Sequence, residues 1–306
     1  MQRYIIRRLL QAVIMLFLIS LIVFLLGRLT GDPVALLLTE YSTEEDRILL
    51  THQLGFDKPL PEQYAIFVSN AMRGDLGRSI RGERAPALNL VLERLPATVQ
   101  LATVVVMVSL LVGLPLGVLS SVNQGTFLDV IVRILALLGQ SAPVFWIGIV
   151  AMYVFSVQLR LLPSSGYGKP EQFVLPVFAM SWFQVASLMR LTRSSMSEAL
   201  DSEYIKLARI KGLSETTVIW KHALRNSLLP VLTYSGIILG RLLAGVVVVE
   251  TVFAWPGIGR LAYEAVMGRD FPVLQAVVLF MAALFLLINL AVDILYAYID
   301  PRIRYS

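Results

Sequence analysis

Cysteine is absent from this chain of 306 residues, histidine occurs only twice, and charged residues make up only 15 % of it. The absence of cysteine excludes disulfides, thiolate metal sites and a cysteine nucleophile. Neither His52 nor His222 has a partner at metal-ligand spacing, and the sequence contains no G-x-x-x-x-G-K-[ST] phosphate loop and no G-x-S-x-G nucleophile motif. We therefore expect no metal and no other cofactor on this chain, and we expect that it is not an enzyme.

The scarcity of charge accompanies an excess of apolar residues. Hydrophobic residues make up 57 % of the chain, whereas a soluble domain is about 45–50 % apolar and about 25 % charged. This composition excludes intrinsic disorder and indicates a polytopic membrane protein. The net charge of +5 is modest, so the composition does not indicate a nucleic-acid-binding protein.

A membrane-spanning helix needs about 20 mostly apolar residues. The sequence predicts six such helices and an all-α fold, with spans over residues 9–27, 97–120, 129–157, 173–189, 229–253 and 273–298. The first apolar run is longer than the core of a signal peptide, which is about 7–15 residues, and no A-x-A cleavage site follows it. We therefore interpret it as a retained helix. Pro115 and Pro143 predict kinks within the second and third spans.

Lysine and arginine predict the orientation of these spans. Twelve of them lie in the N-terminus, the segment 190–228 and the C-terminus, against four in the short loops of the other side. This asymmetry places both termini in the cytoplasm. The predicted units are residues 1–27, with the cytoplasmic N-terminus and first helix, an extracytoplasmic insert over 28–96, and a five-helix core over 97–306 that carries the cytoplasmic loop 190–228.

The cytoplasmic loop 190–228 has a helical pattern although it is too charged to span a membrane. Apolar residues recur at spacings of three and four, which predicts one buried helix face formed by Leu200, Tyr204, Leu207 and Ala208. A second apolar face is predicted further along the loop, formed by Val218, Ile219, Ala223 and Leu224.

A tight turn is predicted between these two helices. Gly212 suits the left-handed position that ends a helix, and Leu213 follows where an apolar residue can pack back on the last turn. Ser214 can cap the next helix, with Glu215 in its first turn. This motif has two interpretations: an amphipathic loop lying on anionic lipid, or a rigid knob that docks into a cytoplasmic partner.

The loop also matches one family over a long stretch at fixed spacing. The matching residues are Glu203-Tyr204-Ile205, Ala208-Arg209, Lys211-Gly212-Leu213, Lys221-His222-Ala223-Leu224-Arg225-Asn226 and Leu228-Leu229-Pro230. They resemble the cytoplasmic coupling segment of permease subunits in binding-protein-dependent ABC importers, in the peptide/nickel branch with its dipeptide, oligopeptide and glutathione systems. Further matches to that branch are Gly31-Asp32-Pro33, Gly74-Asp75-Leu76-Gly77, Pro256-Gly257-Ile258-Gly259-Arg260 and Asp300-Pro301-Arg302. The insert 28–96 is similar to that of branch permeases with a large external insert.

This resemblance implies a type I ABC importer permease in a bacterial inner membrane. It implies a second homologous permease subunit that completes the pore, two ATP-binding subunits that hold ATP and Mg, and an extracytoplasmic substrate-binding protein. The solute would be a peptide or a related small solute, with nickel complexes and haem also within the branch. The residues that the resemblance assigns to ATPase coupling are Tyr204, Ala208, Arg209, Lys211, Gly212, Leu213, Ser214 and Glu215.

Ionisable residues inside the spans suggest further contacts. Arg133 lies four residues after Asp129, which predicts a local ion pair. Glu250 lies near the external end of the fifth span and is expected to anchor the turn that follows it. Arg241 lies deeper, and it either lines the translocation path or meets an acid on another helix. It lies nine residues before Glu250, so the two point to opposite sides of a helix.

Small residues define one face of the fifth span, formed by Gly236, Gly240, Ala244 and Gly245. Such a face permits close helix approach, either within the chain or beside the pore. The candidate pore residues are Arg241, Gly240 and Gly245. In the last span Asn289, Asp293 and Tyr296 share a face, which predicts hydrogen bonds to another helix.

Two other classes of protein remain as alternatives. A secondary transporter driven by an ion gradient needs repeats, broken helices and a midplane ion site, and Asp293 is the one acid well within a predicted span besides Glu250. A membrane scaffold that only anchors the loop 190–228 to a partner is the second alternative.

Overall fold

The computed structural model describes residues 2–29, 38, 43–53, 55–81, 84–243 and 246–299, and every named element within these residues is helical. Five helical stretches are long and apolar enough to span a membrane. They are Ile6–Arg28 in α1 (Gln2–Leu29), α4 (Ala87–Val122), α7 (Glu171–Leu200), Glu215–Leu243 ending in α10 (Leu224–Leu243), and Phe271–Val292 in α13 (Phe271–Ile299). A bent pair of helices brings the count to the predicted six.

The bent pair takes the place of the third predicted span, and its bend lies at Pro143, where the sequence predicts a kink. Helix α5 (Phe127–Ser141) and α6 (Val144–Met152), which continues into the π-helix η1 (Tyr153–Gln158), meet at an angle of 98°. The cause is Pro143, because a proline disfavours helical backbone in the residue before it. Ala142 is accordingly extended, with φ −115° and ψ 141°.

The predicted fifth helix is also interrupted. Helix α10 ends at Leu243, Val246 has non-helical backbone angles (φ −103°, ψ 48°), and α11 (Val247–Val252) follows. Ala244 and Gly245 lie outside the described residues. The fourth helix is longer than predicted, because α7 continues eleven residues beyond the expected end, into the charged loop.

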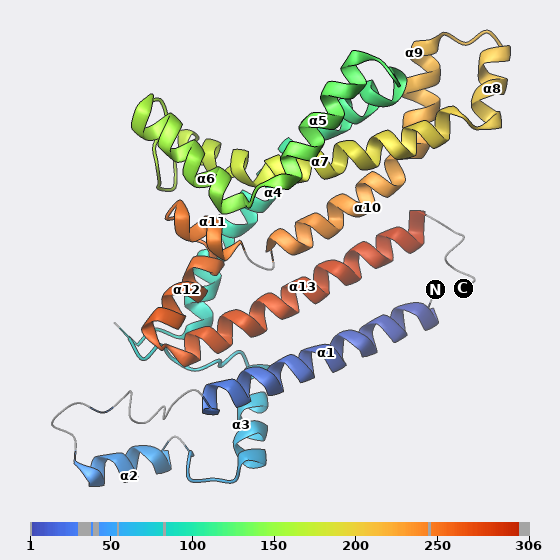
Figure 1. Cartoon of the computed structure of the whole chain (residues 1–306). Coiled ribbons are helices and arrows are strands. Elements are labelled where there is room, and N and C mark those ends of the chain that lie inside the picture. Colours follow the sequence, from blue (N-terminus) through green and yellow to red (C-terminus); the bar gives the residue numbers. More distant parts are fainter. Residues whose placement is uncertain are drawn as a thin grey trace.

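Helices α4 and α7 form the centre of the molecule, and α5, α10 and α13 pack around them (Figure 1). The two central helices approach closely at Gly117, where an added Cβ would come within 2.7 Å of the Met189 carbonyl oxygen. Buried side chains such as Leu101 of α4, Leu188 of α7 and Ile238 of α10 fill the core. Helix α1 lies at the margin, where it packs against α13 and α3 (Leu60–Met72) and leaves most of its apolar residues exposed.

The two ends of the bundle carry different parts of the chain. Figure 1 shows the start of α1, the end of α13 and the helices α8 (Glu203–Ile210) and α9 (Glu215–Thr217) toward one end. Helices α2 (Glu44–Gln53), α3 and α12 (Ile258–Gly268) lie toward the other end. The start of α1, the end of α13 and the helices of the loop 190–228 therefore share one end of the molecule, and the described helices of the insert, α2 and α3, lie toward the opposite end.

Candidate functional site: a turn that projects from two spans

The turn between α8 and α9 has the conformation that the sequence predicts. Gly212 is left-handed, with φ +77°. The Leu213 N–H donates to the Ala208 carbonyl over 3.3 Å, and the Gly212 N–H donates to the Arg209 carbonyl over 2.9 Å. These two bonds define a Schellman motif, which satisfies carbonyl groups that a helix end leaves unpaired. The turn therefore ends α8 with a defined backbone conformation.

Side chains hold the two sides of the turn together. Ser214 caps α9, as predicted, because its hydroxyl accepts a hydrogen bond from the Thr217 N–H over 3.4 Å. Across the turn, Arg209 Nε and Nη2 donate to the two carboxylate oxygens of Glu215 over 2.8 and 3.3 Å. A bidentate arginine–carboxylate pair restricts geometry as well as adding energy. Sequence reasoning missed this pair because its members flank a left-handed glycine, where helical spacing rules do not apply.

The buried face of α8 differs from the predicted one. Ile205 is completely buried, and it packs with Ala208, Val118 of α4 and Val218 in a small apolar cluster. Tyr204 and Leu207, which the helical spacing placed on the buried face, are exposed, and the exposed fraction of Leu207 is 56 %. The prediction is confirmed for Ala208, which is buried, and for Leu200, which packs against the same cluster, and it was wrong for Tyr204 and Leu207. The second predicted face is confirmed, because its members are buried or half-buried, namely Val218, Ile219, Ala223 and Leu224.

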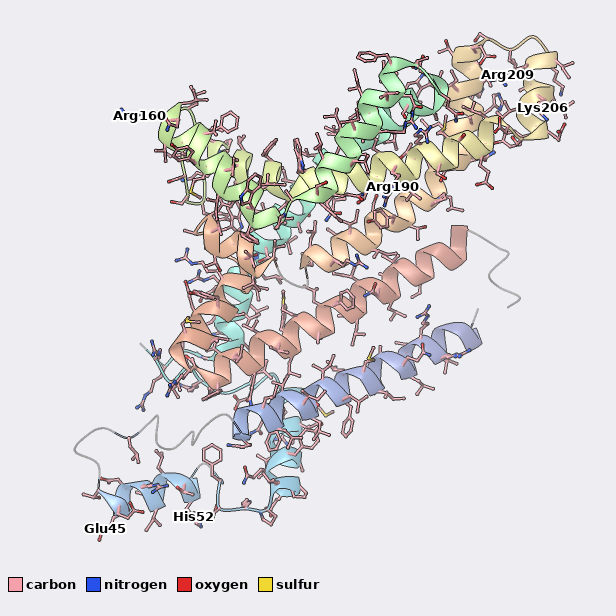
Figure 2. All side chains as sticks on the ribbon, viewed as in Figure 1. Glu45, His52, Arg160, Arg190, Lys206 and Arg209 are labelled. Carbon is pink, nitrogen blue, oxygen red and sulfur yellow. The ribbon has the colours of Figure 1, made fainter. Side chains whose placement is uncertain are left out.

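The outer surface of the turn combines apolar and charged side chains. Ile210 has an exposed fraction of 80 %, and Leu207 and Leu213 are also exposed. Lys206 and Arg209 lie on the same short helix (Figure 2). A hydrogen bond to Glu203 raises the pKa of the Lys206 ammonium, so this lysine stays charged at neutral pH. Exposed apolar residues rimmed by charges are typical of a protein-binding surface.

The turn has a rigid base on both sides. Helix α8 follows the end of α7 after only Asp201 and Ser202, and Ser202 donates to the Ala199 carbonyl. On the other side, α9 continues through the π-helix η2 (Val218–Ala223) into α10 as one span. The turn is therefore joined directly to α7 on one side and to α10 on the other.

A buried carboxylate ties three helices together at the same end of the bundle. The Asp129 side chain is 1 % exposed, and it pairs with Arg133, as predicted, over 3.3 Å. Two partners that the sequence did not reveal also donate to it: Ser120 of α4 over 2.6 Å and Arg193 of α7 over 3.0 Å. The Gly125 N–H completes the set over 3.1 Å.

A second buried carboxylate organises the opposite end. Glu250 is completely buried, its Oε1 accepts from the Thr98 hydroxyl over 2.8 Å, and its Oε2 accepts from the Arg260 N–H over 3.0 Å. The Trp255 N–H donates to the Glu250 carbonyl over 2.7 Å. Glu250 therefore anchors the turn that follows α11, as expected. Arg241 lies before the helix break, so the predicted opposition of the two on one helix does not apply.

Two of the three candidate pore residues, Gly240 and Arg241, are described, and they are neighbours at the end of α10. Gly240 is buried, and an added Cβ would lie 3.4 Å from Ile288 of α13, so its small size serves packing within the chain. Arg241 is exposed in the last turn of α10. Asn289 donates to the Phe285 carbonyl of its own helix rather than to another helix. Gly245 and the side chains of Asp293 and Tyr296 lie outside the described residues.

This geometry defines a class: a polytopic helical membrane protein with a rigid turn on one face and a folded insert on the other. Within the described residues, no group of three or more His, Cys, Asp or Glu could hold a metal ion. Residues 113–305 match the family described as the binding-protein-dependent transport system inner membrane component, and residues 1–102 match its N-terminal domain. The chain belongs to this family: it is a permease subunit of an ABC importer.

Individual relatives support this assignment over the whole length. The chain is 40 % identical over 315 residues to a Brucella abortus protein whose name places it in a peptide transport system, and 39 % identical over 307 residues to a glutathione transport system permease protein of Escherichia coli. Both alignments cover all of this chain and all of the relative. A solved amino acid ABC transporter shares the fold, with a TM-score of 0.51 and 17 % identity over 70 % of this chain and 94 % of the solved one. The family excludes the secondary transporter.

Proposed function

We propose that the turn from Glu203 to Glu215 couples this permease to ATP-binding subunits that lie beneath it. The observation that carries the proposal is the exposed apolar tip, Leu207, Ile210 and Leu213, on a base packed against α4 and α7. ATP and Mg are held by those partner subunits, and this chain performs no catalysis. Coupling residues are Tyr204, Ala208, Arg209, Lys211, Gly212, Leu213, Ser214 and Glu215.

The transmission is mechanical. Closure of the ATP-binding subunits displaces the turn, and the Arg209–Glu215 pair keeps the turn from deforming as it moves. Because α8 adjoins α7 and α9 is continuous with α10, the displacement reaches both spans. Packed elements move as rigid bodies between discrete arrangements, so the pore alternates between outward-open and inward-open states. ATP binding favours one state, and hydrolysis returns the assembly to the other.

The imported solute is a peptide or a related small solute. The support is that relatives covering the whole chain are named for peptide and glutathione transport. A second homologous permease completes the pore, and an extracytoplasmic binding protein delivers the solute to the face that carries the insert 28–96. Both termini lie in the cytoplasm of a bacterium, in accord with the shared end of α1, α13 and the turn (Figure 1). Residues 97–306 form the core.

Arg241 lines the translocation path in this proposal, near Gly240 and Gly245. A charge deep in a membrane costs about 2.5–3.5 kcal/mol on the insertion scale, so such residues face protein or water. Arg241 is exposed and has no ion pair among the described residues. An aqueous path between the two permeases would hydrate it.

Crosslinking tests the coupling role, because the chain contains no natural cysteine. Ile210→Cys is expected to crosslink to an ATP-binding subunit through a short thiol–amine reagent. Met72→Cys, which is similarly exposed but lies in the insert, is the matched control and should not crosslink to that subunit. Labelling of Ile210→Cys by a lipid-soluble thiol reagent, without a crosslink to any protein, would contradict the proposal and favour a loop that lies on the bilayer.

A further inference from the structure

A small polar cavity lies where the insert meets the bundle, away from the turn Glu203–Glu215 and from α7 and α10. Its volume is about 240 Å³, and it is bounded by the end of α1, by α3, by the segment before α4 and by the start of α13. Helix α3 stands beside the end of α1 (Figure 1), and the Phe24 and Phe67 rings hold the two together at a centroid distance of 5.6 Å. The cavity equals the liquid volume of about eight waters.

The first unusual feature of this cavity is a cation without an anion. The Arg28 guanidinium lies 4.0 Å from the centroid of the Phe56 ring and 5.2 Å from that of Phe24. Its Nε is buried without a hydrogen-bond partner, and no ion pair of Arg28 occurs within the described residues. A guanidinium has five N–H donors, and buried donors are almost always satisfied in folded proteins. The cavity therefore lacks an acceptor at this position.

The second feature is an unpaired acceptor in the same wall. Gln63 is 8 % exposed, and its Nε2 donates to the carbonyls of Lys58 and Phe56 over 2.7 and 3.2 Å. Its Oε1 is buried and has no partner. Both amide donors are therefore used, while the acceptor remains free for a donor from within the cavity.

The third feature is a carboxylate that does not neutralise the arginine. Asp75 lines the cavity, and its Oδ1 accepts from the Gly77 N–H over 3.0 Å. It forms no ion pair with Arg28, so the two opposite charges face one space at a distance from each other. A site with a separated cation and anion, and with a free acceptor between helices, complements a molecule that carries a carboxylate and an ammonium group.

We propose that this cavity binds a small zwitterion of amino-acid or dipeptide size, with its carboxylate on Arg28, its ammonium group on Asp75 and a further N–H on Gln63. The site belongs to the insert and not to the pore, and the proposal does not depend on the transport function. A zwitterion bound there would link α3 to α1 and to the start of α13, and so fix the insert against the bundle.

The test uses the full-length chain in its purified assembly, without a binding protein, in phosphatidylcholine nanodiscs. Calorimetry with alanylalanine is expected to show binding, and N-acetyl-alanylalanine and alanylalaninamide, which each lack one charge, should bind at least about tenfold more weakly. Arg28→Gln should weaken binding of alanylalanine at least about tenfold, whereas Arg73→Gln, an exposed arginine outside the cavity, should not change it.

A second variant keeps the proposal testable even where Arg28→Gln fails to insert. Asp75→Asn retains the acceptor for the Gly77 N–H and should abolish the preference for alanylalanine over its N-acetyl derivative. Hydrogen exchange should show ligand-induced protection in residues 55–77 and in the segments of α1 and α13 that line the cavity. The proposal is overturned if the wild-type assembly binds neither alanylalanine nor alanine, as would occur if a lipid phosphate occupies Arg28. Binding that is indifferent to both charged termini, or to Asp75→Asn, overturns it equally.

Discussion

Gly212 offers the most direct way to perturb the coupling turn without touching its packing. The residue has φ +77°, and a Cβ added to it would have no other atom within 4 Å. A substitution there therefore introduces backbone strain and no steric clash. A residue other than glycine in the left-handed conformation costs roughly 1–2 kcal/mol. Asparagine is enriched in this conformation, so Gly212→Asn should be strained less than Gly212→Ala.

This strain should change the turn and not the spans. Ile205 and Val218, on either side of Gly212, are both buried in one apolar cluster with Val118 of α4, which holds α8 and η2 against the spans. A cost of 1–2 kcal/mol shifts a two-state population by a factor of about 5–30. We expect solute uptake per ATP hydrolysed to fall by up to this factor in Gly212→Ala. Gly212→Asp should lose more than Gly212→Asn, because a negative charge at the end of α8 opposes the helix dipole by about 0.3–1 kcal/mol.

The assay measures uptake and ATP hydrolysis on one preparation of proteoliposomes. Gly168→Ala is the matched control, because Gly168 also has positive φ (+106°) and open space around it but lies far from the turn in sequence, before α7. Protease accessibility verifies that the spans of each variant are inserted. Gly212→Asp with the wild-type ratio of uptake to hydrolysis would refute the reasoning about the turn.

Three further predictions concern the Arg209–Glu215 pair and the two buried carboxylates, Glu250 and Asp129. Exchanging Arg209 and Glu215 in a double variant should recover part of the coupling that either single charge reversal loses. A double-mutant cycle should give an interaction energy of about 0.2–1 kcal/mol for the pair, because both side chains are half-exposed. Gly257→Ala should lower the melting temperature of the assembly, because the added Cβ would lie 2.1 Å from Glu250 Oε1. Overpacking of this kind costs about 1–3 kcal/mol. An unchanged melting temperature would contradict this close contact. Asp129→Asn should lower the free energy of unfolding, which denaturant titration measures. The loss should be smaller than the roughly 3–5 kcal/mol lost when a fully buried pair is broken, because Arg133 is half-exposed.

Local sequence signals predicted the parts of the structure that depend on neighbouring residues. The left-handed Gly212, the Ser214 cap and the Asp129–Arg133 pair follow from the preferences of residues at most four positions apart. Glu250 anchors the turn that follows it, as expected from its place just before that turn, through a bond from the Arg260 N–H ten residues further along the chain. Apolar runs likewise predicted the spans, because the membrane imposes one length and one composition on every crossing.

Contacts between distant segments could not be predicted in this way. Nothing in the sequence pairs Arg193 with Asp129, or Thr98 with Glu250, because these contacts exist only once the helices are packed. The buried face of α8 was predicted only in part: Ala208 is buried, and Tyr204 and Leu207 are exposed. Helical spacing identifies candidate faces, but α8 carries apolar residues on two of them, and tertiary packing selects Ile205 over Leu207. The second apolar face remains exposed.

The hydrogen bonds of the two buried carboxylates, together with the helix breaks, indicate where the permease bends. Thr98 and Ser120 lie about 33 Å apart along α4, and each is bonded to one of the buried carboxylates. Helix α4 is thus fixed to the turn after α11 at one end and to α5 and α7 at the other, and it packs along α7 between them. The 98° bend at Pro143 and the non-helical Val246 before α11 lie in the helices beside this pair, not within it. Motion that begins at the Gly212 turn should therefore leave α4 and α7 moving as one body, with the change of angle concentrated at these two breaks.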